Sequence, residues 1–143
     1  MRTLFFVLLA TFGITISSCQ TFKNSDAPEV VKQAFKAKYP KENKPDFAQD
    51  AHGYWEAHFK KNGEKYRADF NADGSWIETE NSIKYKSLPK AVRYAIEKEF
   101  GNDEITEVEH VMSNAKGEFY DVEFKRKGKN YDVEYRKDGS KVN

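Results

Sequence analysis

WEAHFKKNGEKYRADF, residues 55–70, is the stretch that decides the fold of this chain. Apolar and polar side chains alternate on both sides of Asn62-Gly63, and this period of two is typical of half-buried strands. Asn-Gly favours a type I′ turn, because both central positions of that turn need positive φ. The turn gives every apolar residue an apolar partner: Phe59 opposite Tyr66, Ala57 opposite Ala68, and Trp55 opposite Phe70. A shift of one residue would destroy this match, so the stretch predicts a hairpin with one apolar face.

A second turn, at Asp73-Gly74, extends this hairpin into a third strand that ends at Glu80. The spacing places Phe70 opposite Ile77. It therefore predicts that Trp76 lies on the other face of the sheet, beside Glu78 and Glu80.

The strand pattern occurs twice, since residues 120–135 repeat the pattern of residues 55–70. A Pro-led amphipathic helix precedes each copy, starting near Pro28 and Pro89 and ending at Pro40 and Gly101. A further strand is expected at residues 46–51 and 105–112. The predicted fold is α+β: two tandem repeats, residues 26–86 and 87–143, each with one helix on an antiparallel sheet of three to four strands. The helices lie on one face, and the other face is open to water.

The first residues have the layout of a secretory signal, with Arg2 followed by an apolar run from Leu4 to Ile16. Ile16-Ser17-Ser18-Cys19 resembles a bacterial lipobox, in which the cysteine receives the lipid. We therefore expect a signal peptide at 1–18, lipidation of Cys19, and a polar tether at 19–25. A cleaved signal with an incidental cysteine is the alternative. By resemblance to other lipoproteins, Gln20 after the cysteine favours the outer membrane.

Charge balance separates this chain from nucleic-acid-binding proteins. The sequence has 24 Lys and Arg against 23 Asp and Glu, so no basic surplus would attract a nucleic acid. Removal of the signal leaves enough residues for one domain or two small fused units. We expect a monomer in the periplasm or cell envelope.

Several short motifs recur along the chain in a fixed order: Ala27-Pro28 with Ala34-Phe35, Tyr54 to Phe59, Phe70 to Trp76, Leu88-Pro89 with Val92, and Tyr131 to Gly139. This combination covers essentially the whole mature chain and resembles the PepSY-like, β-lactamase-inhibitor-like family of periplasmic proteins. The resemblance implies a fold like that of the β-lactamase inhibitor protein, in which helix-plus-sheet repeats form a curved surface that grips an enzyme. Fold likeness does not transfer inhibition, so no inhibitory residues follow from it.

The open sheet face is the candidate binding surface. The register places Glu123 opposite Asp132 and Asp121 opposite Glu134, and like charges in these positions are destabilising. Such a face could attract a cationic partner or a divalent ion, with Tyr54 and Trp76 as aromatic anchors. A solvated face whose charges prevent aggregation is the alternative.

A calcium-loop pattern overlaps the first repeat. Asp69, Asn71, Asp73 and Glu80, with Gly74, satisfy D-x-[DN]-x-[DN]-G-x5-E. The flanking helices of such a loop are absent from the prediction, so a hairpin turn that mimics the motif is the alternative reading.

No arrangement of His52, His58 or His110 with a nucleophile suggests catalysis, and no cofactor is expected. The sequence thus predicts a lipid-anchored, non-enzymatic module that binds an envelope protein or peptide through its open sheet face. The alternative is a periplasmic domain that binds a divalent cation, such as calcium.

Overall fold

The computed structural model describes residues 27–142. The predicted signal peptide (1–18), the lipidated Cys19 and the tether (19–25) lie outside these residues. No helix among residues 27–142 is long and apolar enough to cross a membrane. Along the chain the elements are α1 (Glu29–Lys38), β1 (Asp46–Gln49), β2 (Trp55–Lys61), β3 (Glu64–Phe70), β4 (Trp76–Ser82), the 3-10 helix η2 (Tyr85–Ser87), α2 (Lys90–Phe100), β5 (Glu104–Ser113), β6 (Gly117–Arg126) and β7 (Lys129–Tyr135).

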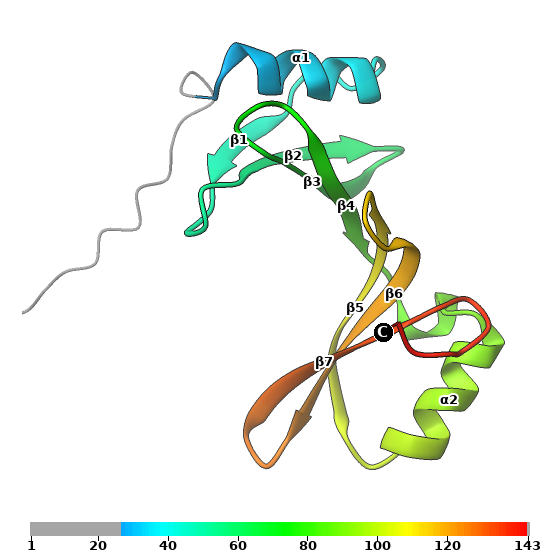
Figure 1. Cartoon of the computed structure of the whole chain (residues 1–143). Coiled ribbons are helices and arrows are strands. Elements are labelled where there is room, and N and C mark those ends of the chain that lie inside the picture. The colour runs from blue at the N-terminus through cyan, green and yellow to red at the C-terminus, as the bar shows by residue number, and fades with distance from the viewer. Residues whose placement is uncertain (1–26, 143) are drawn as a thin grey trace, which may run out of the picture.

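All seven strands form one antiparallel sheet in the order β1 to β7 (Figure 1). The predicted α+β class with an antiparallel sheet is confirmed. The sheet is continuous because β4 pairs with β5 across the α2 connection, with Thr79 opposite Met112. Whether the two halves are copies of one ancestral unit stays a prediction.

The predicted register of both hairpins is confirmed. Phe59 lies opposite Tyr66, and Phe124 lies opposite Tyr131. The φ angle is positive at both turn residues of the first hairpin, 54° at Asn62 and 85° at Gly63. Turn chemistry and apolar alternation therefore set the strand pairing.

The predicted position of Trp76 is wrong. A β-bulge shifts the register of β3 against β4 between Asp69 and Phe70, so Phe70 pairs with Trp76 and not with Ile77. Trp76 consequently packs against the apolar core under α1. Beyond the bulge the predicted register returns, with Glu78 opposite Asp69.

Each helix covers its own part of the sheet. Val31 and Phe35 of α1 are buried against β1, β2 and β3, and Val92 and Ile96 of α2 are buried in a second core with β5, β6 and β7. The pairs Ala68–Thr79, Thr79–Met112 and Val108–Val122 show that both cores lie on the same face of the sheet.

The opposite face, here called the open face, carries two buried apolar residues that the sequence analysis did not place there. Val111 and Phe119 pair with each other on this face and are only 2% and 3% exposed. A small apolar cluster therefore lies at the centre of the open face, outside both helix-covered cores.

Candidate binding face

Opposed carboxylates dominate the open face. In residues 27–142 six cross-strand pairs place one acidic side chain directly opposite another, and the two pairs that the sequence predicts are among them. These pairs are Glu56–Asp69, Asp69–Glu78, Glu107–Glu123, Glu109–Asp121, Asp121–Glu134 and Glu123–Asp132. Strand alternation gathers them on one face because the acidic residues sit at every second position.

Arg67 is the central cation of the first group of carboxylates. Its Nη2 lies 2.9 Å from Oε1 of Glu80, and its Nε lies 3.3 Å from Oδ1 of Asp69. The Glu80 side chain is 12% exposed and the Asp69 side chain 14%. One guanidinium thus partly balances several half-buried acids, and a surplus of negative charge remains.

The second group of carboxylates surrounds Asp121. Lys116 Nζ lies 2.6 Å from Oε1 of Glu134 and so neutralises one neighbour of Asp121. Oδ1 of Asp121 itself is buried and has no hydrogen-bond partner in the structure. The negative charge at this oxygen is therefore not compensated by a hydrogen-bond donor.

The electrostatics of the open face favour protonation. Burial, reinforced by neighbouring carboxylates, raises the pKa of Asp69 and of Asp121 to about 6. Burial is also the main reason that the pKa values of Glu80 and Glu109 lie above the usual range. These acids would more readily carry charge beside a cation supplied by a partner.

Sequence reasoning did not identify Glu109 as a member of this surface. It lies on β5, opposite Asp121, and lines a shallow cavity of about 190 Å³ together with Arg67 and Glu80. The sequence does show that Glu107 and Glu109 alternate and so share one face of a strand. That face can be assigned to the open face only when the pairing of β5 with β6 is known.

The two predicted aromatic anchors do not lie together. Trp76 is on the helix-covered face, where Lys38 Nζ lies 3.3 Å from the ring centroid and the indole Nε1–H donates to Thr79 Oγ1 at 2.9 Å. Tyr54 precedes β2 and is 43% exposed. Of the two residues, only Tyr54 remains a candidate contact.

The predicted calcium ligands do not converge. Asp69 and Glu80 face Arg67, whereas Asp73 accepts hydrogen bonds from the backbone N–H and the hydroxyl of Ser75 at 2.8 and 2.7 Å. Asn71 also donates to the Ser75 hydroxyl, at 2.8 Å. Within the described part of the chain, no group of three or more His, Cys, Asp or Glu side chains is arranged to hold a metal ion.

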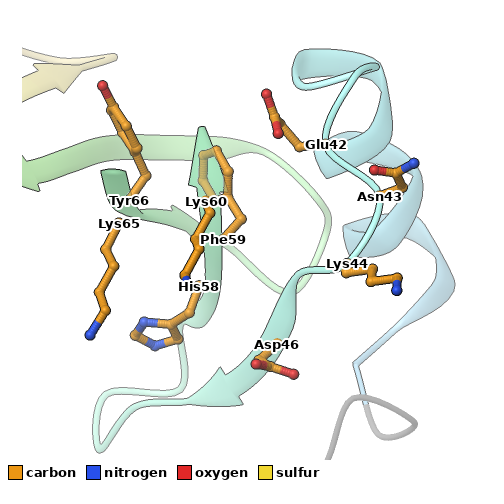
Figure 2. Close-up of a pocket in the computed structure, with 9 residues that line it drawn as sticks. All are labelled: Glu42, Asn43, Lys44, Asp46, His58, Phe59, Lys60, Lys65 and Tyr66. Atoms are coloured by element: carbon orange, nitrogen blue, oxygen red, sulfur yellow. The ribbon is translucent and has the colours of Figure 1, made fainter. Parts of the chain in front are cut away.

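A separate cavity lies at the end of the sheet near α1, between the 42–46 loop and the β2–β3 hairpin (Figure 2). Its volume is about 510 Å³. The lining residues are Glu42, Asn43, Lys44, Asp46, His58, Phe59, Lys60, Lys65 and Tyr66. This cavity is distinct from the carboxylate pairs at the centre of the open face.

A family model described as "beta-lactamase-inhibitor-like, PepSY-like" matches residues 52–141, which is more than half of the chain. The chain belongs to this PepSY-like family. The match begins just before β2 and ends just after β7, so it includes every strand except β1.

Solved structures share the fold of this PepSY-like chain. A DUF2874 family protein from Bacteroides ovatus has 25% identity and a TM-score of 0.71, and the alignment covers 81% of this chain and 84% of that protein. A BLIP-like protein from Bacteroides fragilis has 22% identity and a TM-score of 0.70, with 81% and 83% covered. A "putative periplasmic" protein from Bacteroides eggerthii has 23% identity and a TM-score of 0.70, with 82% and 86% covered. No curated protein matches the chain.

Proposed function

We propose that this PepSY-like protein is an exported, lipid-anchored, non-enzymatic module that binds a protein or peptide of the cell envelope through its open face. The observation that carries the proposal is the set of six opposed carboxylate pairs. The inhibitor-like description of the family also supports a binding role. Export agrees with the signal-like residues 1–18, and Cys19 is the proposed site of lipidation.

The carboxylate pairs oppose the stability of the sheet. Each directly opposed pair of like charges costs roughly a few tenths to 1 kcal/mol relative to neutral residues. The chain as a whole is nearly neutral, with a formal net charge of +1. Arg67 and Lys116 neutralise only part of this acidic surface, and most of the cations that balance the total charge lie elsewhere. Such an uneven charge distribution is expected of a surface shaped by recognition.

The partner that fits this surface presents lysine or arginine side chains. A cation placed between Asp121 and Glu134, or between Glu123 and Asp132, would relieve the repulsion of the pair. Val111 and Phe119 lie near the centre of the face but are almost fully buried, so contact with the partner is mainly polar.

The proposed architecture includes a duplication of one helix-and-strand unit. Two features support it. Asp73 and Asp138 accept the same pair of turn hydrogen bonds, from the backbone N–H and the hydroxyl of Ser75 and Ser140 respectively. The Phe59–Tyr66 and Phe124–Tyr131 rings also stack at the same centroid distance of 5.6 Å.

The test compares partner capture with stability in one triple variant, Asp121→Asn, Glu123→Gln and Asp132→Asn. Crosslinking in intact cells, followed by mass spectrometry, identifies the partner of the wild-type protein, and the purified pair is then titrated. We expect the variant to bind the partner at least tenfold more weakly and to melt at the same temperature or higher. Unchanged affinity would overturn the proposal.

A control variant removes two negative charges from another part of the sheet. Glu64→Gln together with Glu104→Gln changes two exposed acids at the strand ends and should leave partner affinity unchanged. Calcium titration of the wild-type protein, followed by tryptophan fluorescence, examines the alternative function. A saturable change that Asp69→Asn abolishes would favour cation binding over partner binding.

A further inference from the structure

The chain segment formed by α1 and the loop that follows it is rich in lysine. Lys32 and Lys36 lie one helical turn apart on α1, and Lys41 and Lys44 follow in the loop. Lys36, Lys41 and Lys44 are exposed and Lys32 is half-buried. We call these four residues the lysine surface.

Within residues 27–142 these lysines form no salt bridge. Every salt bridge there joins residues at or beyond Glu56, and none includes a residue of the lysine surface. By contrast, Arg67, Lys116 and Arg126 each contact a carboxylate. The positive charge beside α1 is therefore available to an external anion.

Part of the lysine surface is concave, and three of its four lysines line this groove. Lys32, Lys36 and Lys44 line a groove of about 680 Å³, with Phe35 and Phe47 in its floor. The acids of this groove, Glu42 and Asp46, are fewer than its lysines. At a membrane surface, lysine ammonium groups can contact anionic lipid headgroups while the aliphatic stems of the lysines cover apolar protein surface.

The position of the N-terminus indicates which anionic surface is near. The described residues begin at Ala27, directly before α1, and the proposed lipidation site Cys19 is eight residues earlier. Eight extended residues span at most about 28 Å. An anchored chain therefore holds α1 within reach of the bilayer, whereas the β6–β7 hairpin lies at the other end of the molecule (Figure 1).

We propose that the lysine surface rests on anionic phospholipid, which orients the domain on the membrane. Each lysine close to such a surface strengthens attachment roughly fivefold, and salt weakens the effect. This inference goes beyond the proposed partner binding, since it assigns a second surface to a different ligand.

The experiment places the full chain on vesicles and measures how fast individual lysines react with a water-soluble acetylating reagent. The protein can be held on the vesicles by acyl chains at Cys19 or, if the signal is not cleaved, by the apolar run before Cys19. The lysine reaction rates can be compared with either anchor. Vesicles of phosphatidylcholine are compared with vesicles that also contain phosphatidylglycerol, and modified peptides are quantified by mass spectrometry.

We expect the lysine surface to react at least threefold more slowly on phosphatidylglycerol vesicles, a protection lost at about 1 M salt, where the Debye length is about 3 Å. The exposed Lys125, Lys127 and Lys129 of the β6–β7 hairpin are the internal control and should react equally on both vesicles. Equal rates for the lysine surface on both vesicles would overturn the proposal. Protection of the hairpin to the same degree would also overturn it, because it would show adsorption without orientation.

A pair of variants separates local charge from total charge. In Lys32→Gln, Lys36→Gln, Lys41→Gln we expect the remaining Lys44 to lose its protection on phosphatidylglycerol vesicles. The matched variant Lys125→Gln, Lys127→Gln, Lys129→Gln removes the same charge and should leave Lys44 protected. Loss of partner binding in either variant is measured separately, so failure of this inference is distinct from failure of the proposed function.

Discussion

Val111 on β5 lies directly opposite Phe119 on β6, on the face of the sheet that neither helix covers. Both side chains are almost completely buried. Lys116 contributes to the cover of this pair, with its Nζ 5.4 Å from the Phe119 ring centroid. The aliphatic stems of charged residues can thus shield apolar groups while the charges remain in water.

We expect Phe119→Ala to lower the free energy of unfolding by about 3 kcal/mol, because it removes a buried ring and leaves a cavity. Urea denaturation of the variant measures this loss. Met112→Ala is the control, since Met112 is on the neighbouring strand position but is 43% exposed, and it should cost less than about 1 kcal/mol. Equal effects of the two substitutions would contradict the buried position of Phe119.

Thr79 of β4 makes two side-chain hydrogen bonds, one within its own strand and one to the residue that ends α1. Its Oγ1 accepts from the Trp76 indole at 2.9 Å and makes a short hydrogen bond with the Tyr39 hydroxyl. Thr79→Val keeps the shape but leaves the indole N–H and the Tyr39 hydroxyl without this partner. We expect a loss of about 2 kcal/mol in urea denaturation and a changed tryptophan emission maximum.

The control for Thr79 retains the hydroxyl group. Thr79→Ser can still accept from Trp76, so it should recover most of the stability and the wild-type emission maximum. If serine and valine destabilise the protein equally, the hydrogen bonds do not explain the role of Thr79.

Local sequence signals predicted the strand pairing well but the strand ends poorly. Asn62-Gly63 fixes a hairpin register because its backbone angles admit few alternatives. The bulge beside Phe70 has no comparable signal, because an Asp-Gly turn is compatible with more than one strand register. The prediction therefore omitted the bulge and placed Trp76 on the wrong face of the sheet.

The open face could be predicted only where its strands were already paired. Asp121 and Glu134 followed from the hairpin that contains both residues. Glu109 and Val111 needed the pairing of β5 with strands on both sides, which depends on contacts across the α2 connection. Non-local pairing of this kind has no signature in a short window of sequence.

Gly139 approaches α2 closely at a positive φ of 86°. A Cβ at this position would lie 2.7 Å from the carbonyl oxygen of Ala91. Gly63 has nearly the same φ, 85°, but open space around it. We expect Gly63→Ala to cost about 1 kcal/mol, from backbone strain alone, and Gly139→Ala to cost at least about 2 kcal/mol more. Thermal denaturation of both variants measures the difference, and equal losses would exclude a clash with α2.

Asp121 gives the stability a pH dependence of predictable sign. Its pKa rises from the ordinary 3.8 to about 6 in the folded protein, mainly through burial. The folded state therefore binds more protons than the unfolded state between these values, so the free energy of unfolding falls as the pH rises through this window. Asp69 acts in the same direction. We expect the melting temperature to be higher at pH 5 than at pH 7.5.

Asp121→Asn should remove part of this dependence. At pH 7.5 the variant lacks two cross-strand repulsions, and we expect it to be more stable by about 1 kcal/mol, or about 4 °C in melting temperature. At pH 5 the gain should shrink, because the wild-type carboxyl is then largely protonated. The matched change Asp138→Asn should act in the opposite direction at pH 7.5, since hydrogen bonds from Ser140 lower the pKa of the Asp138 carboxyl in the folded state. A stability gain for Asp121→Asn that is the same at both pH values would show that its charge is not the cause.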